Sequence, residues 1–210
     1  MEIDKIKITI ETYNNIVEEY VDYYKSKDLN GNVQVQKEID YLISQLNDNA
    51  TILDAGTAIG DYPKFLTEKC DKNFNVIGID TSENMLRKAK KNAPKAKFKL
   101  MDIRNITFDK DNFDAIICFA ALIHVDDKTC LRVLDKFSEL LKDKGIIAIN
   151  VMECNNEEKE IFIPEPFNPK YETYFNRYSK QFFIDYFTAN NYTIEKIYDN
   201  KMFDESAVGE

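Results

Sequence analysis

Short apolar runs alternate with helical stretches from residue 51 onward, and this alternation restricts the chain to few folds. The expected strands are residues 51–55, 75–80, 97–101, 113–119, 145–151 and 192–198. The expected helices between them are residues 61–70, 82–92, 126–142 and 179–190. Repeated strand–helix units build a parallel sheet with helices on both faces, and central parallel strands are apolar throughout, as residues 113–119 are. The sequence therefore predicts an α/β, doubly wound and mostly parallel sheet.

The segments on either side of this region predict a cap and a lid. Residues 9–25 carry apolar side chains at three- and four-residue spacing, which predicts an amphipathic helix, and residues 33–46 are expected to form a second one. Residues 153–178 are long, mixed in character and proline-bearing, which favours a substrate-facing lid. The 210 residues thus predict one domain. Its parts are a helical N-terminal cap at 1–49, a cofactor-binding core at 50–152, and a lid segment with a C-terminal helix and strand at 153–210.

Charge and composition narrow the class of partner. The net charge is −9, and an acidic surface repels phosphate backbones, so we expect no nucleic-acid partner. The first residues lack an apolar leader, and no run approaches the ~18 apolar residues of a membrane span. Four cysteines without a CxxC pair indicate reduced thiols. We therefore expect a cytoplasmic protein, monomer or homodimer, with no membrane partner. His124 is the single histidine, so a multi-histidine metal site is excluded and no metal is expected.

A glycine-containing loop, DAGTAIG at residues 54–60, follows the first expected strand. Gly56 and Gly60 permit tight backbone turns and close approach of a ligand. In open parallel sheets, ligands bind at the carboxyl ends of the strands. Asp80 ends the second expected strand, where a carboxylate can accept hydrogen bonds from a ribose diol. These positions indicate a nucleotide-like ligand.

Two cofactors fit this outline. A nicotinamide dinucleotide needs GxGxxG, so that a helix N-terminus meets its pyrophosphate, but this loop is GxAxG and includes Asp54. A carboxylate repels a pyrophosphate and attracts the ammonium group of S-adenosylmethionine, which has no phosphate. Asp102, at the end of the third expected strand, can accept from the exocyclic amine of adenine, and the backbone amide of Ile103 can donate to a ring nitrogen. The three acids favour S-adenosylmethionine, and an NAD-dependent oxidoreductase is the alternative.

These motifs resemble those of the class I S-adenosylmethionine-dependent methyltransferases, in their small-molecule branch, over nearly the whole chain. Residues 52–66, 76–90, 97–125 and 140–151 resemble the successive core motifs, and residues 12–24 resemble the N-terminal cap. The resemblance implies a Rossmann-like fold, with Asp80 on the ribose, Met85 near the adenine, and tyrosines over the methionine end. The implied cofactor-binding residues are Asp54, Ala55, Gly56, Gly60, Asp80, Thr81, Met85, Asp102, Ile103, Phe119, Tyr13 and Tyr20.

Three features depart from the family pattern. Ala58 replaces the middle glycine of the loop, and Asp143 and Lys144 replace the proline and a glycine before the fifth strand. A short polar tail follows residues 192–198, where the family has a closing hairpin. These departures leave open a third interpretation, a non-catalytic methyltransferase-like module that binds the nucleoside as a regulator.

The acceptor site has fewer signals, because methyl transfer from a sulfonium is a direct displacement in which alignment supplies much of the catalysis. His124 is a candidate base with a pKa suited to neutral pH, and the alternative is a loop histidine that hydrogen-bonds the backbone. Arg177 and Tyr178 are candidate substrate residues beside Phe167, Tyr171 and Tyr174, since arginine can hold a carboxylate. Packing within the lid is the alternative. Residues 119–122, FAAL, lack the Asn/Asp-Pro-Pro-aromatic run of enzymes that methylate exocyclic base nitrogens, so we expect a small-molecule acceptor.

Overall fold

The computed structural model describes residues 5–25, 33–154 and 159–199. The chain divides into two compact units, Met1–Tyr178 and Ser179–Glu210. The first unit carries the sheet, the N-terminal helices and a hairpin. In the second unit, α7 (Lys180–Ala189) begins at Ser179, whose Oγ accepts the Phe182 N–H. Among the described residues, no helix is long and apolar enough to cross a membrane.

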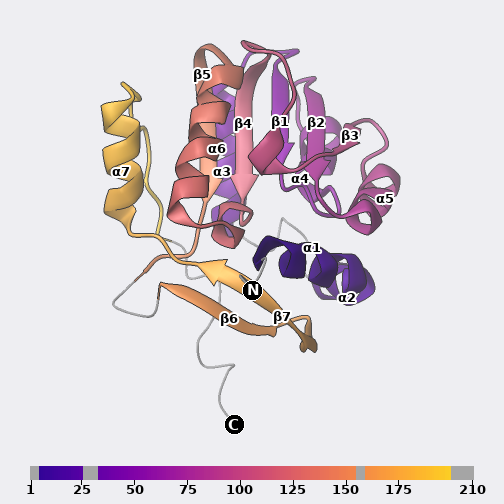
Figure 1. The fold of residues 1–210 in the computed structure, drawn as a ribbon. Helices are drawn as coiled ribbons and strands as arrows, with labels where there is room; N and C mark the ends of the chain where they lie inside the picture. Colours follow the sequence, from indigo (N-terminus) through magenta and orange to yellow (C-terminus); the bar gives the residue numbers. More distant parts are fainter. Residues whose placement is uncertain (1–4, 26–32, 155–158, 200–210) are drawn as a thin grey trace. The chain divides into compact units, whose positions relative to one another are not determined.

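Five parallel strands form the central sheet, in the order β3-β2-β1-β4-β5 (Figure 1). They are β1 (Thr51–Ala55), β2 (Asn75–Asp80), β3 (Lys97–Leu100), β4 (Phe113–Phe119) and β5 (Leu141–Asn150). The strand order reverses between β1 and β4, and ligands of open α/β sheets bind at such a reversal. The predicted doubly wound parallel sheet is confirmed.

Helices cover both faces of this sheet. One apolar cluster joins α3 (Val33–Gln45) and α4 (Asp61–Glu68) to strand residues including Ile52 and Ile117. Figure 1 shows α6 (Asp127–Leu140) on the opposite face, and α5 (Glu83–Asn92) near the β3 edge. Because strand side chains alternate between faces, Leu53 and Ile116, both fully buried, face away from α3 and α4.

The N-terminal segment forms two helices where the sequence predicted one. These are α1 (Lys5–Asn15) and α2 (Val17–Lys25), which meet at the fully buried Ile16. Asparagine disfavours a helix interior because its amide competes for backbone partners. Asn14 and Asn15 precede the break, and the Asn15 side chain donates to the Glu11 carbonyl at 2.8 Å.

The segment predicted as a lid contains an antiparallel hairpin where a long loop was expected, and its substrate-facing role stays a prediction. Its strands are β6 (Glu160–Glu165) and β7 (Asn168–Asn176). Pro164 and Pro169 indicated a loop, but both are exposed, and proline is tolerated at exposed strand edges.

The strand predicted at residues 192–198 is wrong, because residues 192–199 have no regular secondary structure. Ile194 and Ile197 are 38% and 51% exposed, so this apolar run is not a buried strand.

Candidate functional site

The loop after β1 is shaped by left-handed backbone conformations. Gly56, Ala58 and Gly60 have φ values of 86°, 44° and 79°. A Cβ atom on Gly56 would lie 2.4 Å from the Ala121 Cβ, so this loop and the loop after β4 are in direct contact. The N–H groups of Gly56 and Thr57 both donate to the Ile79 carbonyl at 2.9 Å. The loop is therefore held between the ends of β2 and β4.

Asp80, at the end of β2, fixes the middle of this loop. Its Oδ2 accepts the Ala58 N–H at 2.9 Å, and its Oδ1 accepts the Ser82 N–H at 2.8 Å. Burial raises the pKa of Asp80, and these backbone N–H groups act in the opposite direction. The Thr81 N–H also acts on this carboxylate, which has about four lone-pair sites in all. The contact of Asp80 with a ribose diol and the binding of the cofactor by Thr81 remain predictions.

Asp54 is the most deeply buried acid of the predicted site. Its side chain is 2% exposed, and the Thr57 hydroxyl donates to its Oδ2 at 2.6 Å. Burial raises the pKa of Asp54 to about 7, and the negative charges of Asp80 and Asp61 act in the same direction. In the described part of the chain, no basic side chain forms an ion pair with Asp54. A buried carboxylate without a counter-charge fits a ligand that supplies an ammonium group.

Asp102 has a local partner that the sequence analysis missed. Its Oδ1 accepts the Arg104 N–H at 2.8 Å, which starts the short 3-10 helix η2 (Ile103–Asn105). The Arg104 Nε also lies 2.9 Å from Oδ2. The adenine contacts predicted for Asp102 and Ile103 must therefore form beside this guanidinium. Phe119, at the end of β4, packs edge-on against Tyr62 at 5.0 Å between centroids.

The N-terminal helices cover the glycine loop. Tyr13 and Tyr20 pack against Met85 and Ile59, together with Val17 and Val21. The two tyrosine rings lie 6.3 Å apart in an edge-to-face arrangement. The structure therefore gathers the three residues predicted around the nucleoside and methionine ends, Met85, Tyr13 and Tyr20.

Polar contacts attach this cap to the start of α5. The Asn14 side chain accepts the Ser82 hydroxyl at 2.8 Å, and the Asn84 amide donates to the Asn14 carbonyl at 2.7 Å. Lys88 forms an ion pair with Glu18 at 2.7 Å. The polar residues at the start of α5 carried no cap-binding signal in the sequence, because their partners lie about seventy positions away.

His124 ends the short 3-10 helix η3 (Leu122–His124), which follows β4. Its Nδ1 lies 2.9 Å from the Tyr174 carbonyl. A carbonyl only accepts, so Nδ1 carries the proton and Nε2 keeps its lone pair. Burial lowers the pKa of His124 to about 4, so the ring is neutral at pH 7. The ring contacts Tyr13 and Phe175, with centroids 5.3 Å and 5.1 Å away. The expected backbone hydrogen bond is present. The predicted pKa suited to neutral pH is wrong, because burial of the ring lowers it, and the role as a base remains a prediction.

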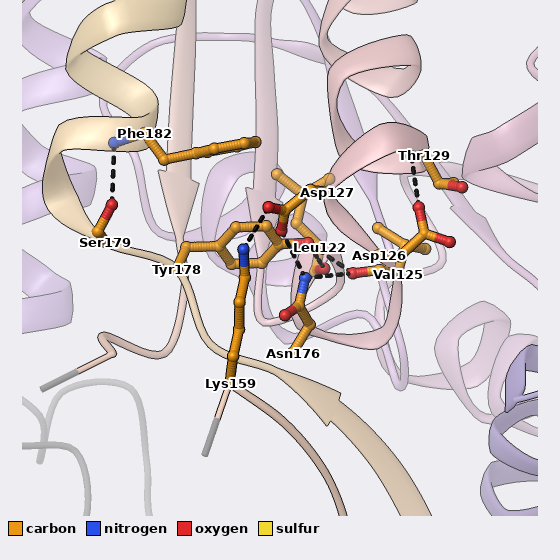
Figure 2. Close-up of polar contacts among 10 residues, drawn as sticks. All are labelled: Leu122, Val125, Asp126, Asp127, Thr129, Lys159, Asn176, Tyr178, Ser179 and Phe182. Atoms are coloured by element: carbon orange, nitrogen blue, oxygen red, sulfur yellow. Dashed lines mark hydrogen bonds and ion pairs between the residues drawn. The ribbon is translucent and has the colours of Figure 1, made fainter. Parts of the chain in front are cut away.

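Figure 2 shows how the end of the hairpin is fastened to residues 122–127. The Tyr178 hydroxyl lies 2.9 Å from the Leu122 carbonyl and 2.6 Å from the Val125 carbonyl. The Asn176 amide donates to the Val125 carbonyl at 3.0 Å, and Lys159 forms an ion pair with Asp127.

Tyr178 is therefore a buried anchor, 1% exposed, whose hydroxyl is engaged by the protein. The N–H of the half-buried Arg177 donates to the Lys159 carbonyl at 2.8 Å. Substrate contacts of Arg177 and Tyr178 remain predictions. Among the described residues, no cluster of three or more His, Cys, Asp or Glu side chains is arranged to hold a metal ion.

Comparisons with known proteins match this architecture. The sequence model of a family described as "Methyltransferase domain" matches residues 52–145. The putative methyltransferase 235L of Invertebrate iridescent virus 6 is 31% identical over 114 residues, which cover 53% of this chain and 42% of that protein. The demethylmenaquinone methyltransferase of Thermotoga maritima is 27% identical over 143 residues, covering 68% and 61%. This chain therefore spans less than two thirds of either relative.

A solved structure described as a DhpI–SAM–HEP complex superposes with a TM-score of 0.69 at 15% identity, covering 90% of each chain. The PH0226 protein from Pyrococcus horikoshii OT3 gives a TM-score of 0.61 at 20% identity, covering 80% of this chain and 88% of the other. Likeness at such low identity concerns the fold. The family model matches the core, and the glycine loop lies at the end of β1. The fold of this chain is therefore the one that the sequence motifs predicted. Residues 52–145 of this chain therefore resemble the methyltransferase domain that this family model describes.

Proposed function

We propose that this chain binds S-adenosylmethionine at the carboxyl ends of β1 to β4 and transfers its methyl group to a small molecule. The observation that carries the proposal is the pair of acids around the glycine loop. Asp54 is buried without a basic partner in the described residues, and Asp80 holds the Ala58 N–H at 2.9 Å. An ammonium group would complete the surroundings of Asp54, and a ribose diol would use the remaining lone pairs of Asp80.

The protein's contribution to transfer is alignment and the removal of a proton. S-adenosylmethionine supplies a methyl group on a sulfonium, whose carbon–sulfur bond breaks as the acceptor attacks. Tyr13 and Tyr20 cover the glycine loop, and aligned reactants without bulk water lower the barrier to such a displacement. His124 is neutral, with its lone pair on Nε2, so it can accept a hydrogen bond or proton from an acceptor O–H or N–H.

A small acceptor is supported by the covering of His124. The ring packs against Tyr13 from the cap and against Phe175 from the hairpin, which disfavours access by a macromolecule. The name of the Thermotoga maritima relative, demethylmenaquinone methyltransferase, supports the same class of acceptor.

Calorimetric titration tests cofactor binding. We expect S-adenosylmethionine and S-adenosylhomocysteine to bind with micromolar dissociation constants, whereas NAD does not bind. Tight binding of NAD without binding of S-adenosylhomocysteine would refute the proposal.

The role of His124 needs a variant that keeps its structural hydrogen bond. In His124→Asn, the side-chain amide can still donate to the Tyr174 carbonyl, but the Nε2 lone pair is lost. We expect His124→Asn to lower kcat roughly 100-fold, with the affinity for S-adenosylhomocysteine unchanged. Equal turnover of wild type and His124→Asn would show that the histidine is structural.

A further inference from the structure

A second buried carboxyl lies in the hairpin, outside every role assigned above. Glu165 ends β6 and is 1% exposed. Its Oε2 accepts the Thr173 hydroxyl at 2.8 Å, and Thr173 is itself fully buried. Within the described ranges, no lysine, arginine or histidine forms an ion pair with Glu165. Burying an ionised carboxylate without a counter-charge is energetically costly, so a ligand that supplies the counter-charge would stabilise it.

The register of the hairpin shows which face carries this carboxyl. Ile163 pairs directly with Thr173, and Ile161 with Phe175, so these four side chains share one face of the hairpin. The hydrogen bond to Thr173 places the Glu165 carboxyl on that same face. The Phe175 ring contacts His124 at 5.1 Å. The buried carboxyl therefore lies on the hairpin face that meets the proposed base.

Aromatic rings connect the turn of the hairpin, which follows Glu165, to His124. Phe167 follows Glu165 by two residues in the turn of the hairpin, and its ring centroid lies 4.9 Å from that of Tyr20. Tyr20 contacts Tyr13 at 6.3 Å, and Tyr13 contacts His124 at 5.3 Å. The five rings thus form a chain of contacts from the turn of the hairpin through the cap to His124 and back to Phe175 in β7, and Tyr13 and Tyr20 also belong to the cofactor cap.

We propose that Glu165 binds an ammonium group of the methyl acceptor, held among the aromatic rings of the cap and the hairpin. The proposal rests on the proposed transferase function and narrows its substrate class to small amines. The ammonium group gives a proton to the Glu165 carboxylate, and the neutral nitrogen then attacks the methyl group as its bond to sulfur breaks. A carboxylate and aromatic rings together attract alkylammonium ions, through charge-assisted hydrogen bonds and through the negative faces of the rings. Burial raises the pKa of Glu165, and a bound cation would favour the ionised form again. The acidic chain, with a net charge of −9, also attracts cations.

The test uses the full chain and a panel of small metabolites in three groups: primary and secondary amines, neutral alcohols and thiols, and carboxylic acids without an amine. Turnover is followed by release of S-adenosylhomocysteine, and binding by thermal shift of the S-adenosylhomocysteine complex. Glu165→Gln removes the charge but keeps an acceptor for Thr173. Glu172→Gln is the matched control, because it removes an exposed carboxylate from the same hairpin. Glu165→Asp keeps the charge on a shorter side chain.

We expect the amines to be the preferred acceptors, with Glu165→Gln raising their KM roughly tenfold or more. The affinity for S-adenosylhomocysteine should stay unchanged, Glu172→Gln should match wild type, and Glu165→Asp should recover part of the loss. The inference fails if the accepted compounds carry no amine, if KM is the same in Glu165→Gln, or if no amine binds at millimolar concentration. Failure of S-adenosylhomocysteine to bind the wild type would instead refute the proposed function.

Discussion

Asp54 makes both the stability and the cofactor affinity of this protein depend on pH. Its pKa is raised from 3.8 to about 7 in the folded chain, with burial as the main cause. An acid whose pKa is raised on folding stabilises the native state below its unfolded pKa. That contribution is lost as the pH rises through the folded pKa. About three units correspond to on the order of 4 kcal/mol, so unfolding of the unliganded protein should become easier between about pH 4 and pH 7.

Cofactor binding should reverse this preference. An ammonium group beside Asp54 favours the carboxylate, lowers its pKa, and causes a proton to be released on binding near pH 7. Affinity should therefore fall as the pH drops below about 7, by up to roughly tenfold per pH unit. Calorimetry with S-adenosylhomocysteine, in two buffers of different ionisation enthalpy, measures the released proton directly.

Asp54→Asn is the matched variant, because its amide oxygen still accepts from the Thr57 hydroxyl but does not titrate. The variant should bind the ligand more weakly at pH 8, release no proton, and lose the pH dependence. The same pH dependence in Asp54→Asn, or no proton release by the wild type, would refute the contact between this carboxylate and the ammonium group.

Four further changes test the site and its supports. Asp80→Ala should weaken binding of S-adenosylhomocysteine by about 1–3 kcal/mol, measured by calorimetry. Glu83→Gln, at the exposed start of α5, is the control and should bind as the wild type does. Equal affinities of Asp80→Ala and wild type would mean that Asp80 does not contact the ligand. Gly56→Ala should lower the free energy of unfolding by at least about 2 kcal/mol, because the methyl group meets Ala121. Ala58→Gly should instead raise it by about 1 kcal/mol through relief of the left-handed φ, and a loss of stability in that variant would contradict the strain. Tyr178→Phe should destabilise the protein by about 1–3 kcal/mol in thermal unfolding, and an unchanged midpoint would show that the hairpin is held elsewhere.

The core of the fold was predictable because its signals are local. Each parallel strand is a short apolar run, and the loop that follows it lies at the same edge of the sheet as the other such loops. The acids near the carboxyl ends of β1 and β2, Asp54 and Asp80, therefore had to lie near each other once a parallel sheet was expected. Their distinct partners, a hydroxyl for Asp54 and backbone N–H groups for Asp80, were not predictable, because they depend on the loop conformation.

The elements that cover the site depend on contacts between distant residues, and there the sequence predictions were weaker. The hairpin is fixed by long-range hydrogen bonds, such as the Tyr178 hydroxyl to the Val125 carbonyl and the Thr12 hydroxyl to the Glu172 carbonyl. No local pattern encodes them. At residues 192–198, a short apolar run indicated a strand, but a strand needs a partner, and a local pattern does not report one.

Left-handed φ values explain how the chain departs from its family pattern without losing the fold. Ala58 and Lys144 stand where the family pattern has glycine, and their φ values are 44° and 61°. The backbone therefore keeps the glycine-type turn at both positions and accepts local strain of about 1–2 kcal/mol at each. A departure of this kind changes stability more than it changes the position of the loop, so Ala58 is weak support for a non-catalytic module.

The family model matches only part of the chain, and this explains why the comparisons identify the class of cofactor more readily than the methyl acceptor. The family match covers residues 52–145, which include the glycine loop, Asp80 and His124. The rings that surround His124 come from outside this range, from Tyr13 in α1 and Phe175 in β7. Glu165 also lies outside it. The proposed acceptor site therefore depends on the helical cap and the hairpin, which lie outside the family match, and variants of those two elements are where substrate specificity should be tested.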